Sequence, residues 1–176
     1  MSFISQRELR QYAARTSLQE SDGSIKVARA RGRKTVFLSH SHKDYEAAKG
    51  LKNRLKEQQV DVYIDWEDTT MPEQPDKITA QKIRDKIVEC HIFMFLVTQN
   101  SVTSRWCPWE IGYADGKKIF EQILVVPTVD DQGTFHGNEY LQLYRRLIIS
   151  DQQQKVAVFD PGQERGNLFE SYMRTL

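Results

Sequence analysis

Three short polar segments of the sequence contain the side chains that could take part in chemistry. They are residues 39–44 (SHSHKD), residues 65–66 (DW) and residues 104–110 (SRWCPWE). In the third segment Trp106 and Glu110 are four residues apart, so on a helix their ring and carboxylate would share one face. A carboxylate in such a place can stabilise a positive charge that develops in a transition state.

The first segment combines hydroxyl, imidazole and ammonium groups just before a predicted helix. The hydroxyls of Ser39 and Ser41, with Lys43 and the free N–H groups of that helix, could bind phosphate. His40 and His42 without a third ligand nearby do not define a metal site, so we predict no metal. The spacing also resembles no nucleophile elbow, and hydrogen bonding within a loop is the interpretation we favour.

The segments around these clusters alternate between strand and helix patterns. Strands are predicted at residues 35–38, 60–65, 92–97 and 123–127, and helices at 43–58, 77–89 and 106–120. The run 92–97 is continuously apolar, which is typical of a strand buried on both faces. In the last third, either 147–149 or 156–159 supplies a final strand, and 167–175 a closing helix.

This alternation predicts an α/β fold, with an open, parallel, five-stranded sheet of flavodoxin-like order and helices on both faces. In such sheets the ligand lies beyond the carboxyl ends of the strands, where the strand order reverses. That point falls between the first and third strands. We therefore expect the loop after residue 38 and the loop and helix after residue 97 to form the pocket.

The N-terminal region has its own signals. Ser5 and Glu8 form a capping-box pattern, with Ile4 and Leu9 at the flanking apolar positions, so a short helix is expected at about residues 6–14. The polar, basic stretch that follows resembles a linker. We predict two parts: residues 1–32, an N-terminal helix and basic linker, and residues 33–176, the domain proper.

Whole-chain composition narrows the class of protein. A net charge of +1 gives no field that would attract nucleic acid or an anionic membrane. Cys90 and Cys107 are too few for a disulfide scaffold and fit a reducing cytosol. The longest apolar run is far shorter than the ~20 residues of a membrane-spanning helix, and no signal peptide precedes it. We expect a cytoplasmic protein with no membrane or nucleic-acid partner.

The three polar segments and their strands resemble the TIR (Toll/interleukin-1 receptor) domain family, in its standalone bacterial form. Residues 34–44 (KTVFLSHSHKD) are similar to the family's opening strand, and residues 60–66 (VDVYIDW) to its second strand and the start of the BB loop. Residues 104–110 resemble its S-x-W-C-x-x-E segment, which puts Glu110 at the catalytic glutamate. The resemblance covers roughly residues 33–130. The stretch 71–77 (MPEQPDK) lacks the family's usual turn glycine, so loop-mediated partner contacts are not carried over.

The resemblance implies an NAD+ nucleosidase or ADP-ribosyl cyclase that cleaves the nicotinamide–ribose bond. Glu110 would stabilise the oxocarbenium-like transition state, and Trp106 or Trp66 would stack on or wall the substrate. Asp65 would orient a ribose or the nicotinamide amide, and the predicted phosphate binders, together with His40, would complete the substrate-binding set. The products would be nicotinamide and ADP-ribose or a cyclic isomer, with NAD+ as substrate and no other cofactor.

The same resemblance implies self-association through TIR–TIR contacts, an effector that senses the nucleotide product, and a role in bacterial anti-phage defence signalling. Two alternatives stay open: a non-enzymatic TIR–TIR adaptor, and an enzyme like a nucleoside deoxyribosyltransferase. Taken alone, Trp106 would be a core residue and Glu110 a solvated residue near a helix N-terminus. Their joint presence favours the enzyme, because an adaptor needs neither.

Overall fold

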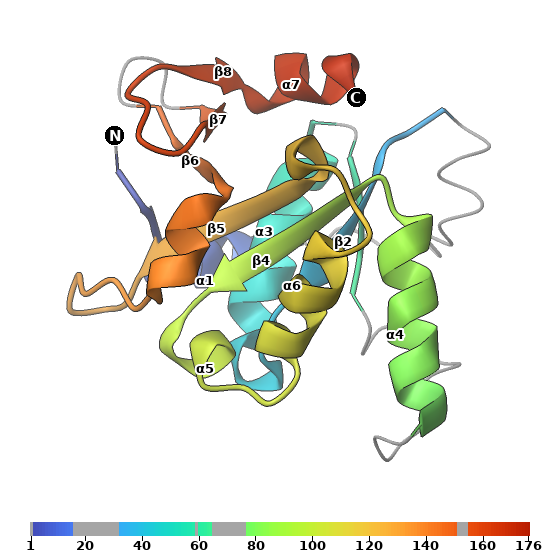
Figure 1. Cartoon of the computed structure of the whole chain (residues 1–176). Coiled ribbons are helices and arrows are strands. Elements are labelled where there is room, and N and C mark those ends of the chain that lie inside the picture. Colours follow the sequence, from blue (N-terminus) through green and yellow to red (C-terminus); the bar gives the residue numbers. More distant parts are fainter. Residues whose placement is uncertain (1, 16–31, 59, 65–76, 151–154) are drawn as a thin grey trace.

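The protein is described here by a computed structural model that places residues 2–15, 32–58, 60–64, 77–150 and 155–176. An open sheet runs through the molecule, with helices on both of its faces (Figure 1). The strands are β1 (Ile4–Ser5), β2 (Thr35–Ser39), β3 (Asp61–Tyr63), β4 (Ile92–Val97), β5 (Ile123–Val129), β6 (Arg145–Ile149), β7 (Val156–Phe159) and β8 (Gly166–Leu168). The helices are α1 (Gln6–Arg15), α3 (Tyr45–Lys56), α4 (Lys77–Glu89), α5 (Gln99–Val102), α6 (Cys107–Asp115) and α7 (Phe169–Thr175), with 3-10 turns η1 (His42–Asp44), η3 (Phe120–Gln122) and η4 (Glu139–Leu143).

The strand order is β3-β2-β4-β5-β6-β7-β8. Its first five strands are parallel and follow the predicted flavodoxin-like order, so the predicted fold class is confirmed. The sheet is nevertheless larger than the five strands expected. Strand β6 leaves β5 after two register pairs and continues antiparallel to β7, which in turn pairs with β8. Both late candidate strands therefore form, and β1 pairs with the end of β5 beyond the part that β6 contacts.

Strand β4 shows why its sequence is apolar throughout. All of its residues are buried, and successive side chains face opposite sides of the sheet. Ile92, Met94 and Leu96 pack in one cluster with residues of α3 and α7, whereas Phe93 and Phe95 pack in another with residues of α4 and α6. The prediction of a strand buried on both faces is confirmed.

The helices differ from the predictions mainly at their ends. Helix α4 has the predicted bounds, but α6 ends at Asp115, five residues early. At its end the Gly116 N–H donates to the carbonyl groups of Ala114 and Gly112; glycine is a poor helix former, and the chain must turn back toward β5. Helix α5 was expected to be loop. It begins with a capping box between Thr98 and Ser101, in which serine takes the place of the usual glutamate or glutamine, so the common sequence pattern is absent.

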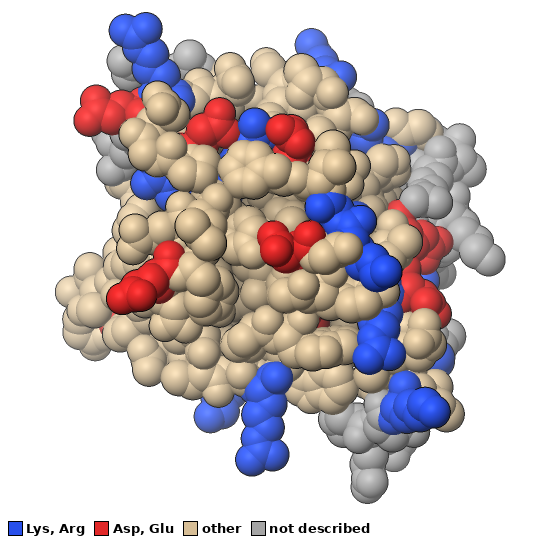
Figure 2. Space-filling view, viewed as in Figure 1, with Lys and Arg blue, Asp and Glu red and all other residues tan. Residues whose placement is uncertain are grey.

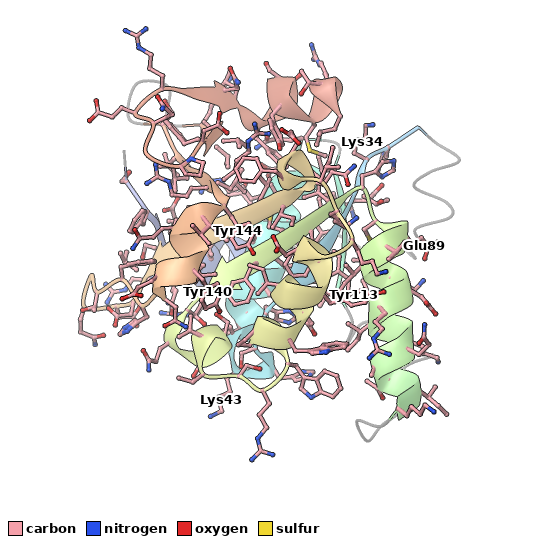
Figure 3. The ribbon with its side chains drawn as sticks, in the orientation of Figure 1. Lys34, Lys43, Glu89, Tyr113, Tyr140 and Tyr144 are labelled. Atoms are coloured by element: carbon pink, nitrogen blue, oxygen red, sulfur yellow. The ribbon has the colours of Figure 1, made fainter. Side chains whose placement is uncertain are left out.

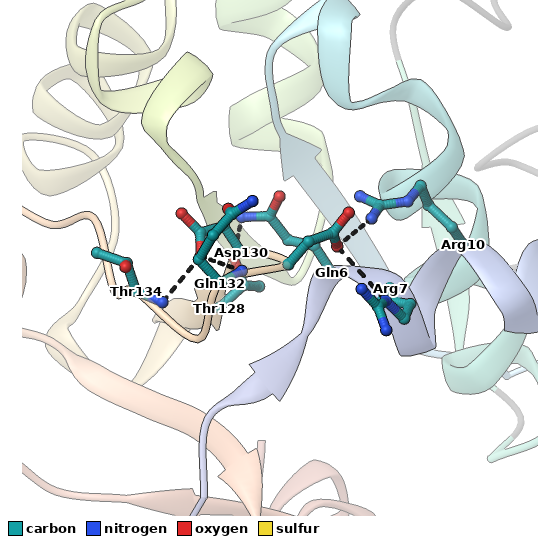
Figure 4. A network of polar contacts seen from close by, with 8 residues as sticks. Gln6, Arg7, Arg10, Thr128, Asp130, Gln132 and Thr134 are labelled. Atoms are coloured by element: carbon teal, nitrogen blue, oxygen red, sulfur yellow. Dashed lines mark hydrogen bonds and ion pairs between the residues drawn. The ribbon is translucent and has the colours of Figure 1, made fainter.

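The N-terminal helix is part of the same core. Leu9 is fully buried, as its flanking position predicted, and lies against α3 so closely that a Cβ atom at Gly50 would be 1.9 Å from its carbonyl oxygen. The Gln6 amide donates to the Thr128 hydroxyl, 3.1 Å away, and Arg7 and Arg10 pair with Asp131 (Figure 4). The division after residue 32 stays a prediction, and the linker at 16–31 lies outside the described residues.

The surface of the folded chain has charged side chains of both signs (Figure 2). Figure 2 shows basic and acidic side chains on the same face of the molecule, in keeping with the net charge of +1. Among the helices that the structure describes, none is long and apolar enough to cross a membrane.

Candidate functional site

The site lies where the strand order reverses. Strands β2 and β4 are parallel neighbours, with Ser39 in register with Phe95, so their carboxyl ends meet at one edge of the sheet. From that edge the chain continues into η1 and α3 after β2, and into α5 and α6 after β4. The loops after β2 and β4 therefore lie together at the predicted edge, between the first and third strands of the parallel order, and their role as a substrate pocket stays a prediction.

Glu110 and Ser39 meet at this edge. Glu110 lies in the first turn of α6, where its N–H donates to the Trp106 carbonyl oxygen over 2.9 Å. The Ser39 hydroxyl donates to Oε2 of Glu110 over 2.5 Å, across 71 residues of sequence. Both are buried, with 1% of Ser39 and 4% of Glu110 exposed. A hydrogen bond to a carboxylate and the positive end of a helix dipole favour the ionised form of such a group, whereas burial favours the protonated form.

Trp106 stands at the N-cap position of α6 and is half-buried. Its ring meets the ring of Trp109 edge-on at 5.5 Å between centroids, and both pack against the apolar cluster beneath α4 and α6. The Ser104 hydroxyl accepts from the N–H of Trp106 (3.1 Å) and of Cys107 (3.4 Å), which starts the helix. Trp106 thus has a packing role beside Glu110, and its predicted substrate contact stays a prediction.

Three other predicted binding residues, His40, Ser41 and Lys43, follow β2 and differ in how far they are buried. The Ser41 hydroxyl caps η1 by accepting from the Lys43 N–H at 3.4 Å, and His40 is 8% exposed, with Nδ1 3.2 Å from the Leu38 carbonyl oxygen. Lys43 is exposed at the surface (Figure 3). The structure therefore brings Ser39 to Glu110 and leaves Lys43 in solvent.

Asp65 and Trp66, and the proline-containing stretch 71–76, lie outside the described residues. Their assignment to substrate binding stays a prediction.

Asp44 is a residue of the site that sequence reasoning did not assign. Its carboxylate is buried and accepts from the Thr98 hydroxyl (2.5 Å) and the Asn100 amide (2.7 Å), while its N–H donates to the Ser41 carbonyl oxygen (2.8 Å). Asp44 thereby fastens the loop after β2 to the start of α5. The bond to Thr98 spans 54 residues, so no local pattern in the sequence could have indicated it.

Metal ligation and cysteine chemistry find little support in the part of the chain that is described. It contains no group of three or more His, Cys, Asp or Glu residues that could hold a metal ion. Cys90 and Cys107 are buried free thiols, and burial raises the pKa of Cys90 to about 12. A thiol with so high a pKa is not a nucleophile at neutral pH.

Two clefts open elsewhere on the surface. One, of about 340 Å³, is lined by residues of β7, β8 and α7 together with Glu121 and Arg145; the other, of about 300 Å³, lies between α1, α3 and β7. Neither is lined by Ser39 or Glu110. Glu110 is itself only 4% exposed.

Comparison with known proteins agrees with this geometry. Residues 36–157 match the family described as TIR domain, and the chain belongs to that family. One relative, from Bacillus cereus (strain MSX-D12), is named probable 3' cyclic ADP-D-ribose synthase ThsB'; it is 36% identical over 127 residues, which cover 69% of this chain and 66% of the relative. A second, from Cytobacillus dafuensis, is named putative cyclic ADP-D-ribose synthase TIR2 and is 29% identical over 90 residues, which cover 48% of this chain. The matches span less than two thirds of either relative, 66% and 24%.

Proposed function

We propose that this chain cleaves NAD+ at the bond between nicotinamide and ribose. The observation that supports this most strongly is a buried carboxylate, Glu110, held by Ser39 at the edge of the sheet where α/β proteins bind ligands. The nicotinamide of NAD+ is a cationic pyridinium and leaves as a neutral molecule, so the reaction needs no general acid. The transition state is oxocarbenium-like, and a nearby carboxylate stabilises its positive charge.

We assign the rings and the pyrophosphate of the substrate to the other predicted binding residues. Trp106 would lie against a ring of the substrate, because it starts the helix that carries Glu110. His40 and Lys43, on the loop after β2, would contact the pyrophosphate, and Asp65 and Trp66 would complete the nicotinamide side. These assignments rest on the resemblance of the three segments to TIR domains.

The names of the relatives support a cyclic product in this chain too. After nicotinamide leaves, either water or the adenine of the same molecule can capture the cation. Water gives ADP-ribose, and the adenine gives a cyclic isomer that is suited to signalling. We infer that the product acts in bacterial anti-phage defence, where a separate effector senses it.

The proposal includes a change of conformation. Glu110 is nearly inaccessible, so the active form must expose it, and self-association of TIR domains is the means that we propose. Activity would then rise more steeply than linearly with protein concentration. If the chain consumes NAD+ under no condition, a non-enzymatic adaptor becomes the favoured function.

The test is an incubation of the purified chain with NAD+ over a series of protein concentrations, with the products separated by chromatography. The wild type is compared with Glu110→Ala and with Glu89→Ala, a carboxylate on α4 that lies outside the proposed site. We expect nicotinamide in equal amounts from wild type and Glu89→Ala and none from Glu110→Ala, with the second product identifying a hydrolase or a cyclase. Nicotinamide from all three proteins would disprove the site, and none from any, even at high concentration, would disprove the function.

A further inference from the structure

We propose that Ser39 is a positioning residue that keeps the buried Glu110 carboxylate ionised and fixed in one orientation before substrate binds, an inference that rests on the proposed NAD+ cleavage. Sequence reasoning placed the Ser39 hydroxyl against a phosphate. The structure instead directs it to Oε2 of Glu110, at 2.5 Å. In this proposal Ser39 acts through Glu110, and its predicted contact with a phosphate stays a separate prediction.

The physical need for such a residue comes from burial. Only 4% of Glu110 is exposed, and removal of a carboxylate from water favours its protonated form. A protonated Glu110 could not stabilise a developing positive charge. An O–H donor at hydrogen-bond distance opposes this, because it bonds more strongly to a carboxylate than to a carboxylic acid.

Ser39 is well placed to hold an orientation as well as a charge. It is the last residue of β2, is itself 1% exposed, and is in register with Phe95 of the fully buried β4. Its backbone is therefore fixed by the sheet. Glu110 lies in the first turn of α6, so its hydrogen bond with Ser39 joins strand β2 to helix α6.

Other titratable groups on the neighbouring elements must be separated from this effect. Strand β4 and helix α5 have none. Helix α6 contributes Cys107, Tyr113 and Asp115, of which Asp115 bonds to Tyr144, and Arg105 precedes the helix. The loop and turn after β2 contribute His40, His42, Lys43 and Asp44, and α4 contributes Lys77, Lys82, Arg84, Asp85, Lys86 and Glu89. His40 is the buried group among these whose ordinary titration falls nearest to neutral pH, and His40→Gln is the variant that isolates its contribution.

The experiment is a titration of the Glu110 carboxyl carbon by NMR in the full chain labelled with ¹³C-glutamate. Glu110→Gln assigns the resonance, and the titration is repeated in Ser39→Ala, Ser39→Thr and His40→Gln. We expect the midpoint to rise by roughly one pH unit in Ser39→Ala, a tenfold change in the ionisation ratio. Ser39→Thr, which keeps a hydroxyl, should restore it. Ser101→Ala removes another buried serine hydroxyl, bonded to the Thr98 carbonyl oxygen, and should leave the midpoint unchanged.

The same variants are then assayed for nicotinamide release across pH. The proposal predicts that the acid limb of kcat/KM moves upward in Ser39→Ala in step with the NMR midpoint, so that activity recovers at higher pH. An unchanged midpoint in a folded Ser39→Ala protein, or an equal loss of activity at every pH, would overturn it. Because the titration needs no turnover, a chain that failed to consume NAD+ would refute the proposed function while the role of Ser39 could still be judged.

Discussion

Substitution of Gly50 by alanine tests how closely the N-terminal helix is joined to the domain. A Cβ atom at this position would lie 1.9 Å from the Leu9 carbonyl oxygen and 2.6 Å from its carbonyl carbon, both backbone atoms of α1. Helix propensity alone favours alanine over glycine by about 1 kcal/mol. A clash with backbone cannot be relieved by a side-chain rotation, so α1 must shift, and overpacking of this kind costs about 1–3 kcal/mol or more.

The net expectation is that Gly50→Ala lowers the free energy of unfolding by about 2 kcal/mol, which lowers Tm by roughly 4–8 °C in a domain of this size. The matched control is Gly112→Ala, also in a helix, where an added Cβ meets nothing within 4 Å. That variant should be more stable than the wild type by about 0.5–1 kcal/mol. Urea and thermal unfolding measure both. If Gly50→Ala were stabilised like Gly112→Ala, the packing of α1 on α3 described above would be wrong.

Two further changes probe the site loop and the core. Asp44→Ala removes the acceptor for the Thr98 hydroxyl and the Asn100 amide and should lower the free energy of unfolding by about 2 kcal/mol. The control Glu46→Ala, at an exposed position two residues on, should change it by no more than about 0.5 kcal/mol, and urea unfolding measures both. The raised pKa of Cys90, about 12, means that its contribution to stability is complete below the unfolded-state value near 8.5 and declines as the pH rises toward 12. Between pH 7 and 10 the wild type should therefore lose about 2 kcal/mol more than Cys90→Ala, and equal losses would contradict the burial of the thiol.

Much of the fold could be predicted because its signals are local. The apolar run of β4, the helical spacing of α4 and the apolar residues that flank α1 each depend on neighbours within a few residues, and all three elements formed as expected. The parallel order of the sheet followed from the alternation of strands and helices. From that order the edge between β2 and β4 could be identified before any contact was known.

The parts that could not be predicted depend on contacts distant in the sequence. Strand β8 is short and largely exposed, and it pairs with β7, which itself pairs with β6. The bond between Ser39 and Glu110 spans 71 residues. The sequence identified both residues as candidates but assigned the Ser39 hydroxyl to phosphate binding. A serine hydroxyl before a helix can bond to a phosphate as well as to a carboxylate.

In the proposed reaction the negative charge of Glu110 stabilises the transition state of NAD+ cleavage. The most direct measurement compares nicotinamide release by the wild type and by Glu110→Gln, a substitution that keeps the shape of the side chain and an oxygen to accept from Ser39 but removes the charge. We predict a loss of at least about 100-fold in kcat, the magnitude typical of a lost electrostatic stabiliser, with an unchanged unfolding transition. Equal rates for the two folded proteins would contradict the assignment of Glu110 and the mechanism built on it.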